Sequence, residues 1–445
     1  MSTSSSGIQG DAAAANLPGS AASSGLFYGW VMLPLATLAL IASSPAQTFG
    51  VSAFNEPFRT SLGLSLSQLT GAYMFGTLLA SLPMGYIGAL MDRHGLRATL
   101  LVVVTLFGGV CILTSQVQGV VSLFFSFLFL RMLGQGALGM LSGNALAFWF
   151  ERRLGTVEGL RHVGMAGAIA FMPALNIWLI HQFGWRWAYV LLGLTVWAVM
   201  LPALLFLWRD RPEEMGQHKD GLPPQAGDRD AVETAEQEAR TSLTLREALA
   251  TRAYWIIMAC SAVWSMLGTA LLFNVLPLFT SRGLGGADAA WLFTIFALSL
   301  AVMHVVGGLL ADRLPLNVLL AFGVAALAGA MGMAWQINSP MWVYPLGGLL
   351  GLSQGLMVAA GSPIWPRYFG RAYMGRIRGT AATVLVAASS VGPFIMGAGY
   401  DLLGSYDQVM LLFALLPVPL CLLALIATTP AKRRARLAAM AAAPA

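Results

Sequence analysis

Charged residues are scarce in this sequence. Only 10% of its 445 residues are Asp, Glu, Lys or Arg, whereas a soluble domain carries roughly 25%. The hydrophobic fraction is 57% and the mean hydropathy is +0.73. This composition excludes a soluble enzyme and a disordered regulator, and it excludes a nucleic-acid-binding protein even though the pI is about 9.5.

Cysteine is also rare. Cys111, Cys260 and Cys421 each lie inside an apolar run, with no CxxC or Cys/His spacing. We therefore expect no disulfide framework, no metal site and no cofactor. The apolar runs are about 20 residues long and do not alternate with polar positions, which argues against a transmembrane β-barrel. Because a spanning helix needs about 20 apolar residues, the sequence predicts a helical membrane protein that crosses the bilayer many times.

The apolar runs divide the chain into two membrane units joined by a polar linker. We expect a disordered cytoplasmic tail over 1–26, helical bundles over 27–208 and 253–430, a linker over 209–252 and a basic tail over 431–445. The expected helix cores are 28–53, 66–91, 98–115, 120–149, 157–182, 186–208, 253–280, 288–311, 316–336, 341–366, 375–402 and 407–428.

Basic residues fall almost entirely on one side of this arrangement. Of the 25 Lys and Arg residues, only Arg59, Arg186 and Arg282 fall in the opposite set of loops, and Arg131 falls within a helix. Basic residues concentrate in cytoplasmic loops. We therefore expect both termini and the linker to be cytoplasmic. The high Ala, Gly and Arg content further suggests a bacterial source and the inner membrane as its location.

The two halves of the chain repeat each other. The pattern Gly88-x-x-x-Asp92-Arg93 recurs as Gly308-x-x-x-Asp312-Arg313, 220 residues later. Other pairs in nearly the same register are Pro57 and Pro277, Gly63 and Gly283, Pro173 and Pro393, Gly184 and Gly404, and Gln135 and Gln354. The sequence thus predicts an all-α membrane protein with twelve transmembrane helices in two six-helix repeats. Parallel repeats of this kind suit alternating access around a site at the membrane midplane.

Two motifs resemble those of the major facilitator superfamily. The segment Gly88-Ala-Leu-Met-Asp92-Arg93-His94-Gly95-Leu96-Arg97 is similar to the family loop G-x-x-x-D-R/K-x-G-R-R/K, with Leu96 in place of one basic residue. The segment Arg131-Met-Leu-Gly134-Gln135-Gly136 resembles the arginine and glycine signature of the family's helix 4. The resemblance covers about residues 27–430. It implies the major facilitator fold and a transporter that works as a monomer.

A narrower resemblance points to the monocarboxylate porters. Trp149-Phe150-Glu151-Arg152-Arg153, followed by Gly159 and Gly164, is similar to a motif of that branch, as is Phe27-Tyr28-Gly29-Trp30. The branch carries a basic residue in helix 8, and the corresponding position here is His304. This resemblance implies a small monocarboxylate as substrate.

The loop motif and its repeat are candidates for a gate. Asp92 can accept hydrogen bonds from the N-terminal amides of a neighbouring helix and pair with an arginine, which would hold the cytoplasmic side closed. The alternative is that these charges only fix the topology. The residues concerned are Gly88, Asp92, Arg93, Gly95 and Arg97, with Gly308, Asp312 and Arg313 in the repeat.

Arg131 is the principal candidate for substrate binding. It lies about eleven residues inside a helix, and no Asp or Glu lies in any expected helix core. A charge at this depth faces a cavity or a partner. Either an anionic substrate supplies that partner, or Arg131 is a structural hub that bonds to helix carbonyls, Gln135 and water.

The remaining candidates are polar groups in other helices. An unperturbed histidine has a pKa of about 6.5, which makes His304 a candidate for proton coupling. It could instead be a neutral histidine bonded to a neighbouring helix. Gln135, Gln354 and Asn274 either line the cavity or bridge helices.

These observations favour a secondary transporter of a small organic anion, similar to a monocarboxylate, coupled to protons. The first alternative is a proton-driven exporter of a drug or natural product. The second is a transporter-like sensor that binds a ligand without moving it. The sequence contains no nucleophile and base set and no ATP-binding loop, so we expect neither an enzyme nor a pump driven by ATP.

Overall fold

The computed structural model describes residues 27–150, 153–221, 241–370 and 373–431, together with 433 and 435. Within these ranges every regular element is a helix. The predicted tail 1–26, residues 222–240 of the linker and most of 431–445 lie outside the described residues, as do Glu151, Arg152 and the side chains of Asp92 and Asp312.

The first half of the chain forms one helical bundle. Its elements are α1 (Gly29–Ala42), η1 (Ser44–Ala46), α2 (Thr48–Ser52), α3 (Asn55–Leu62), α4 (Leu66–Ala80), α5 (Met84–His94), α6 (Leu96–Thr114), α7 (Val120–Leu130), η2 (Arg131–Leu138), α8 (Gly139–Trp149), α9 (Leu154–Pro202) and η3 (Ala203–Leu207). The short 3₁₀ helices η4 (Pro212–Met215) and η5 (Lys219–Gly221) follow in the linker.

The second half forms the other bundle. Its elements are α11 (Leu245–Leu249), α12 (Arg252–Phe273), α13 (Val275–Ser281), α14 (Gly286–Arg313), α15 (Leu316–Trp335), η6 (Pro340–Trp342), α16 (Val343–Phe369), α17 (Met374–Leu403), α18 (Asp407–Leu415) and α19 (Pro417–Leu425). The end of the linker packs on this half, because Leu243 and Ala248 are buried in its core.

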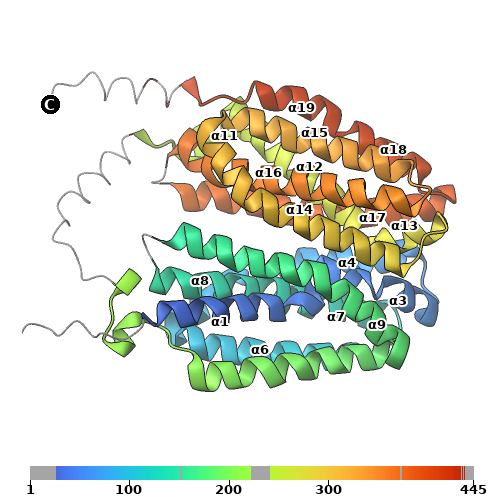
Figure 1. The fold of residues 1–445 in the computed structure, drawn as a ribbon, viewed down its shortest axis with the longest axis horizontal. Helices are drawn as coiled ribbons and strands as arrows, with labels where there is room; N and C mark the ends of the chain where they lie inside the picture. Colours follow the sequence, from blue (N-terminus) through green and yellow to red (C-terminus); the bar gives the residue numbers. More distant parts are fainter. Residues whose placement is uncertain are drawn as a thin grey trace, which may run out of the picture.

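The described chain contains twelve helical spans, as predicted. Ten segments are long and apolar enough to span a bilayer. One of them, Thr156–Leu207, is 52 residues long and passes through Gly184, whose φ of 76° and ψ of 160° are not helical. The chain turns back there (Figure 1), so this segment supplies two spans. A further span consists of α4 and α5, which a turn at 81–83 divides into two shorter helices.

The two halves lie side by side, and the internal repeat extends to individual contacts. Figure 1 shows the first half in blue to green and the second in yellow to red, with α11, from the end of the linker, at one end of the molecule. Arg97, at the start of α6, donates from Nε to the carbonyl of Leu204 at 2.8 Å. Asn317 occupies the equivalent place in α15 and donates to the carbonyl of Leu425 at 2.6 Å. Each contact ties the third span of a half to its last span.

The halves are joined at the end opposite the linker. There the Nδ2 of Asn55 donates to the carbonyl of Phe273 at 2.5 Å, and the rings of Tyr73 and Phe273 are 4.1 Å apart between centroids. A side chain at Gly397 would meet the hydroxyl of Thr70 at 2.5 Å, so α17 and α4 are in close contact. We call this the closed end and the other the linker end.

Candidate functional site

Arg131 is the first residue of a π-helical segment, η2, within the fourth span. The sequence predicts a continuous helix over 120–149, and the structure instead has α7, η2 and α8 in that range. Such π segments are rare and frequently occur at functional sites. The fourth span packs tightly against the first span here, since a Cβ on Gly134 in η2 would lie 2.4 Å from the Cβ of Ala46 in η1. Arg131 is only 3% exposed.

An interruption of the first span provides the partners of Arg131. Pro45 has no N–H to donate, and the hydroxyl of Ser44 donates to the carbonyl of Ile41 at 2.5 Å instead. Gln47 then adopts extended dihedral angles (φ −74°, ψ 154°). The helical ladder is therefore broken, and the carbonyl of Ala46 is available to a side chain from another helix.

The guanidinium of Arg131 makes only weak hydrogen bonds. Its Nη1 donates to the carbonyl of Ala46 at 3.3 Å and to the Oγ1 of Thr48 at 3.4 Å, whereas charge-assisted bonds are about 2.7–2.9 Å long. The guanidinium carbon also lies 4.9 Å from the centre of the Tyr73 ring, a cation–π contact. Its Nε is buried and has no partner in the described part of the chain. A structural role therefore accounts for only part of its hydrogen-bonding capacity.

A small pocket of about 100 Å³ lies beside Arg131, between the two halves. Thr77, Arg131 and Gln135 each contribute a buried polar atom without a hydrogen-bond partner among the described residues, namely Oγ1, Nε and Oε1. Leaving such atoms unpaired is costly, so a polar ligand that reached them would restore their hydrogen bonds. The residues that line the pocket are Thr77, Ala80, Ser81, Met84, Arg131, Gln135, Gly136, Val386 and Ser389.

His304 lines a different and larger cavity of about 820 Å³, which lies toward the linker end. Its Nδ1 is buried and has no partner within the described ranges. Gln354 directly precedes the lining residue Gly355, and its Oε1 is also buried without a partner there. The lining residues are Thr156, Glu158, Gly159, His162, His304, Gly308, Ala311, Gly355, Val358, Ala359, Pro363 and Arg367. The structure therefore brings Arg131 and Gln135 together and places His304 elsewhere.

Asn274 belongs to neither of these two cavities. It is fully buried between α12 and α13, and its Nδ2 donates to the carbonyls of Ala270 at 3.1 Å and Pro393 at 3.4 Å. It thus ties α12 to α17 within the second half. Asn55, its counterpart 219 residues earlier, makes the contact with Phe273 that joins the halves. Asn55 was not among the site residues predicted from the sequence.

The loop between α5 and α6 is occupied by the linker. Asp210 accepts a hydrogen bond from the backbone N of Arg97 at 2.8 Å, so it places a carboxylate at the N-terminus of α6. Gly95 has a φ of 86°, and a Cβ there would lie 2.9 Å from the Oδ2 of Asp210. The side chain of Arg97 donates hydrogen bonds to carbonyls of η3, at the end of the sixth span. These contacts lie within the first half and the start of the linker, and none reaches the second half.

The side chains of Arg93 and Arg313 make no such contacts with the residues that the structure describes. Arg93 and Arg313 are exposed at the linker end. A Cβ on Gly88 or Gly308 would meet nothing within 4 Å. A gate at this loop and its repeat remains a prediction.

The structure also shows a polar cluster at the start of α9, which the sequence did not predict as a site. The guanidinium of Arg161 is buried and binds Oε2 of Glu158 at 2.7 Å and the hydroxyl of Ser142 at 2.8 Å. The ring of His162 lies 6.0 Å from the ring of His304, measured between centroids. The sequence places His162 near the end of one helix and His304 in another half, and only the packing of α9 on α14 brings them together.

Known proteins share this fold and sequence pattern. The "Probable sulfoacetate transporter SauU" of Cupriavidus necator is 26% identical over 378 residues, which are 78% of this chain and 82% of that protein. Two solved structures of a bacterial homolog to the human lysosomal transporter Spinster are similar in fold. The inward-facing and occupied form has a TM-score of 0.68 at 14% identity and covers 92% of this chain and 99% of its own. The inward-facing and unoccupied form has a TM-score of 0.62 at 15% identity and covers 93% and 94%.

A family model that matches both halves of the chain identifies the family. The family model described as Major Facilitator Superfamily matches residues 32–287 and 260–444. Its extent agrees with the twelve spans and the repeated contacts of Arg97 and Asn317. This chain therefore belongs to the Major Facilitator Superfamily of membrane transporters.

Proposed function

We propose that this transporter carries a small organic anion, similar to a monocarboxylate, together with protons by alternating access. One observation carries the proposal: the buried, incompletely bonded guanidinium of Arg131 lines a small pocket that both halves share. A charge within the membrane needs a partner. Among the described residues that line the pocket none is acidic, so an anionic substrate is the natural partner.

The size of the pocket supports a small substrate. Its volume of about 100 Å³ corresponds to roughly three water molecules, at about 30 Å³ each. Pockets that bind drug-sized ligands have volumes of about 300–1,000 Å³. The pocket therefore suits a carboxylate or sulfonate headgroup with a short carbon chain. The relative named as a probable sulfoacetate transporter carries an organic anion according to its name, which supports the same class.

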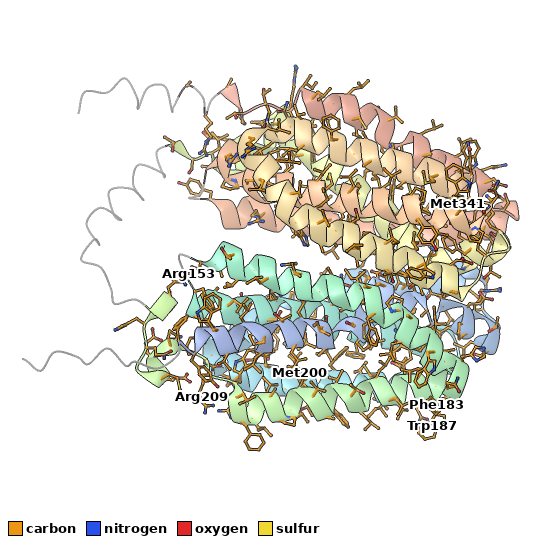
Figure 2. The ribbon with its side chains drawn as sticks, viewed as in Figure 1. Arg153, Phe183, Trp187, Met200, Arg209 and Met341 are labelled. Atoms are coloured by element: carbon orange, nitrogen blue, oxygen red, sulfur yellow. The ribbon has the colours of Figure 1, made fainter. Side chains whose placement is uncertain are left out.

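The distribution of contacts supports alternating access. The two halves meet through Asn55, Phe273 and Tyr73 at the closed end, while the larger cavity lies toward the linker end. In Figure 2, Arg153 and Arg209 lie at the linker end, and the exposed aromatic residues Phe183 and Trp187 lie at the other. Basic residues favour the cytoplasmic side and aromatic residues the interfaces. We therefore assign the linker end to the cytoplasm, so that the structure faces inward in the inner membrane.

The larger cavity favours a second candidate. Its 820 Å³ falls within the range of drug-sized ligands, and it contains His304, which could couple the exit of such a ligand to protons. This second candidate is a proton-driven exporter of a drug or natural product.

Purified protein in liposomes with a trapped pH dye separates the two candidates. A panel of acetate, lactate, pyruvate, sulfoacetate and malate is added outside. We expect internal acidification by at least one acid above that of protein-free liposomes. Loss of a charge-assisted hydrogen bond is worth about 1.5–3 kcal/mol, so Arg131→Gln should lower the rate by at least about tenfold.

Two further variants sharpen the result. Arg131→Lys keeps the charge and removes the planar donor group, and we expect an intermediate loss. Arg186→Gln removes an arginine that bonds the carbonyls of Ser115 and Val117 away from the pocket, and it should transport normally. If no acid acidifies liposomes that contain folded protein, the anion assignment is wrong and the exporter is favoured.

A further inference from the structure

His162 and His304 face each other across the boundary between the two halves. His162 lies on α9 and His304 on α14, and both line the larger cavity. Their ring centroids are 6.0 Å apart and the rings are edge to face, at 74°. They are the two histidines of this cavity, and each comes from a different half.

Each ring has a nitrogen that is not committed to another group. Nδ1 of His162 lies 2.8 Å from the backbone carbonyl of Glu158. A carbonyl only accepts hydrogen bonds, so Nδ1 carries the hydrogen and Nε2 is the remaining nitrogen. Nδ1 of His304 is buried and has no partner among the described residues. One ring can therefore donate to the other.

The described charged residues that line the cavity, Glu158 and Arg367, are already engaged. Glu158 lies 3.7 Å from Nδ1 of His162, but its carboxylate also binds Arg161 at 2.7 Å. Arg367 on α16 donates to the carbonyl of Ala311 at 3.1 Å. On the other elements packed against α9 and α14, Arg97 of α6 bonds to Leu204, and α1, α2, α8, α13 and α15 contain no charged residue.

We propose that His162 and His304 form one proton-binding site that spans the two halves. The inference rests on the proposed proton coupling and names the groups that carry it out. A hydrogen bond between two imidazole nitrogens is about 3 Å long, which places the ring centres about 5 Å apart. The observed separation is only about an ångström larger. Closing the linker end would therefore let one proton bridge the two rings.

The number of protons on the pair matters for the transport cycle. One proton gives an N–H···N bond with a charged donor, which is stronger than a neutral bond and favours closure of the linker end. A second proton leaves no acceptor between the rings and adds repulsion. Opening the linker end separates the rings and breaks the bridge, so the proton is held less tightly and leaves on that side.

The chain has only five histidines, which makes a direct test practical. The protein is labelled with ¹⁵N at the imidazole nitrogens, and each signal is assigned with a single His→Gln variant in nanodiscs. In the wild type we expect His162 and His304 to titrate in two coupled steps. In His162→Gln or His304→Gln the remaining ring should titrate in one step between them.

The matched control is His181→Gln, which lies on α9 outside the cavity and should leave both steps in place. Independent titration of the two rings, unchanged by removal of either, would overturn the proposal. This result is distinguishable from failure of the proposed function. If the rings titrate in a coupled way but no acid in the panel is transported, the histidine pair stands and the anion assignment is wrong. If an acid is transported but the rings titrate independently, the anion assignment stands and the histidine pair is wrong.

Discussion

The carboxylate of Asp401 in α17 accepts a hydrogen bond from the backbone N of Ser67 in α4 at 2.7 Å. The two residues belong to different halves. The contact places a negative charge at the N-terminus of a helix, where it is stabilised by the helix dipole. It therefore holds the closed end together by an interaction that must break when that end opens.

Asp401→Asn should shift the protein toward the state that is open at this end. The amide keeps an oxygen acceptor and loses the charge, whose interaction with a helix terminus is worth about 0.3–1 kcal/mol. We expect the ratio of open to closed molecules to rise about twofold to fivefold, measured by electron–electron distance spectroscopy between spin labels on α3 and α18. Asp407→Asn is the control, because Asp407 binds Arg282 within the second half. Equal distance distributions for Asp401→Asn and the wild type would contradict this prediction.

Thr77→Val should have opposite effects on stability and on transport. The hydroxyl of Thr77 is buried without a partner within the described chain, so its removal should leave the free energy of unfolding unchanged or raise it slightly. If the hydroxyl binds the anion, the apparent Michaelis constant should rise about fivefold to tenfold, for a hydrogen bond of about 1 kcal/mol. Thermal unfolding in detergent and uptake into liposomes measure the two quantities.

The control for this variant is Thr114→Val. Thr114 is also buried, but its hydroxyl bonds to the carbonyl of Val110 at 2.8 Å and to Ser126 at 2.7 Å. We expect it to lose stability and to transport the anion with an unchanged Michaelis constant. A loss of stability in Thr77→Val as large as that in Thr114→Val would show that Thr77 is bonded within the protein.

Gly134→Ala should destabilise the protein and disturb the Arg131 site. The added methyl would lie 2.4 Å from the Cβ of Ala46 and 2.6 Å from the ring of Phe107. The first and fourth spans would therefore have to move apart. Such overpacking costs about 1–3 kcal/mol. Gly139→Ala, on the same span, meets nothing within 4 Å and should stabilise the helix by up to about 1 kcal/mol. Thermal unfolding of the two variants in parallel provides the comparison, and equal unfolding temperatures would count against the close packing.

Asp210→Ala should lower the unfolding temperature, because it removes a contact between the linker and α6. Asp210 bonds to the backbone N of Arg97 at the start of α6, and loss of such a cap costs about 0.5–2 kcal/mol. Glu213→Ala changes an exposed carboxylate in η4 and should have no measurable effect. Comparable losses in both variants would mean that the effect comes from the net charge of the linker.

Much of the fold could be predicted because it depends on composition and on the spacing of a few residues. Apolar runs mark the spans, and the recurrence of Gly88 and Asp92 at Gly308 and Asp312 marks the repeat. The structure adds the paired contacts of Arg97 and Asn317, which sit at the same offset. These features are local or periodic, so sequence alone reveals them.

The shape of the candidate site could not be predicted in the same way. The break at Pro45 and the π-helical segment at Arg131 lie inside apolar runs, where hydropathy averaged over a window stays high. These two irregularities supply the carbonyl of Ala46 and orient the guanidinium. The approach of His162 to His304 depends on how two separate bundles pack, which no pattern within either half encodes.

The uncompensated guanidinium of Arg131 has an electrical consequence. The pocket without an anion carries a positive charge, because none of its described lining residues is acidic. Moving one elementary charge across a potential of 100 mV involves about 2.3 kcal/mol of work. A monovalent anion cancels this charge and the proton on the His162–His304 pair adds one back, so the empty and the loaded carrier both move one positive charge through the field. These two movements are opposite in direction and cancel over the cycle, so the resting voltage of the cell would bias each half of the cycle without changing the final accumulation of the anion.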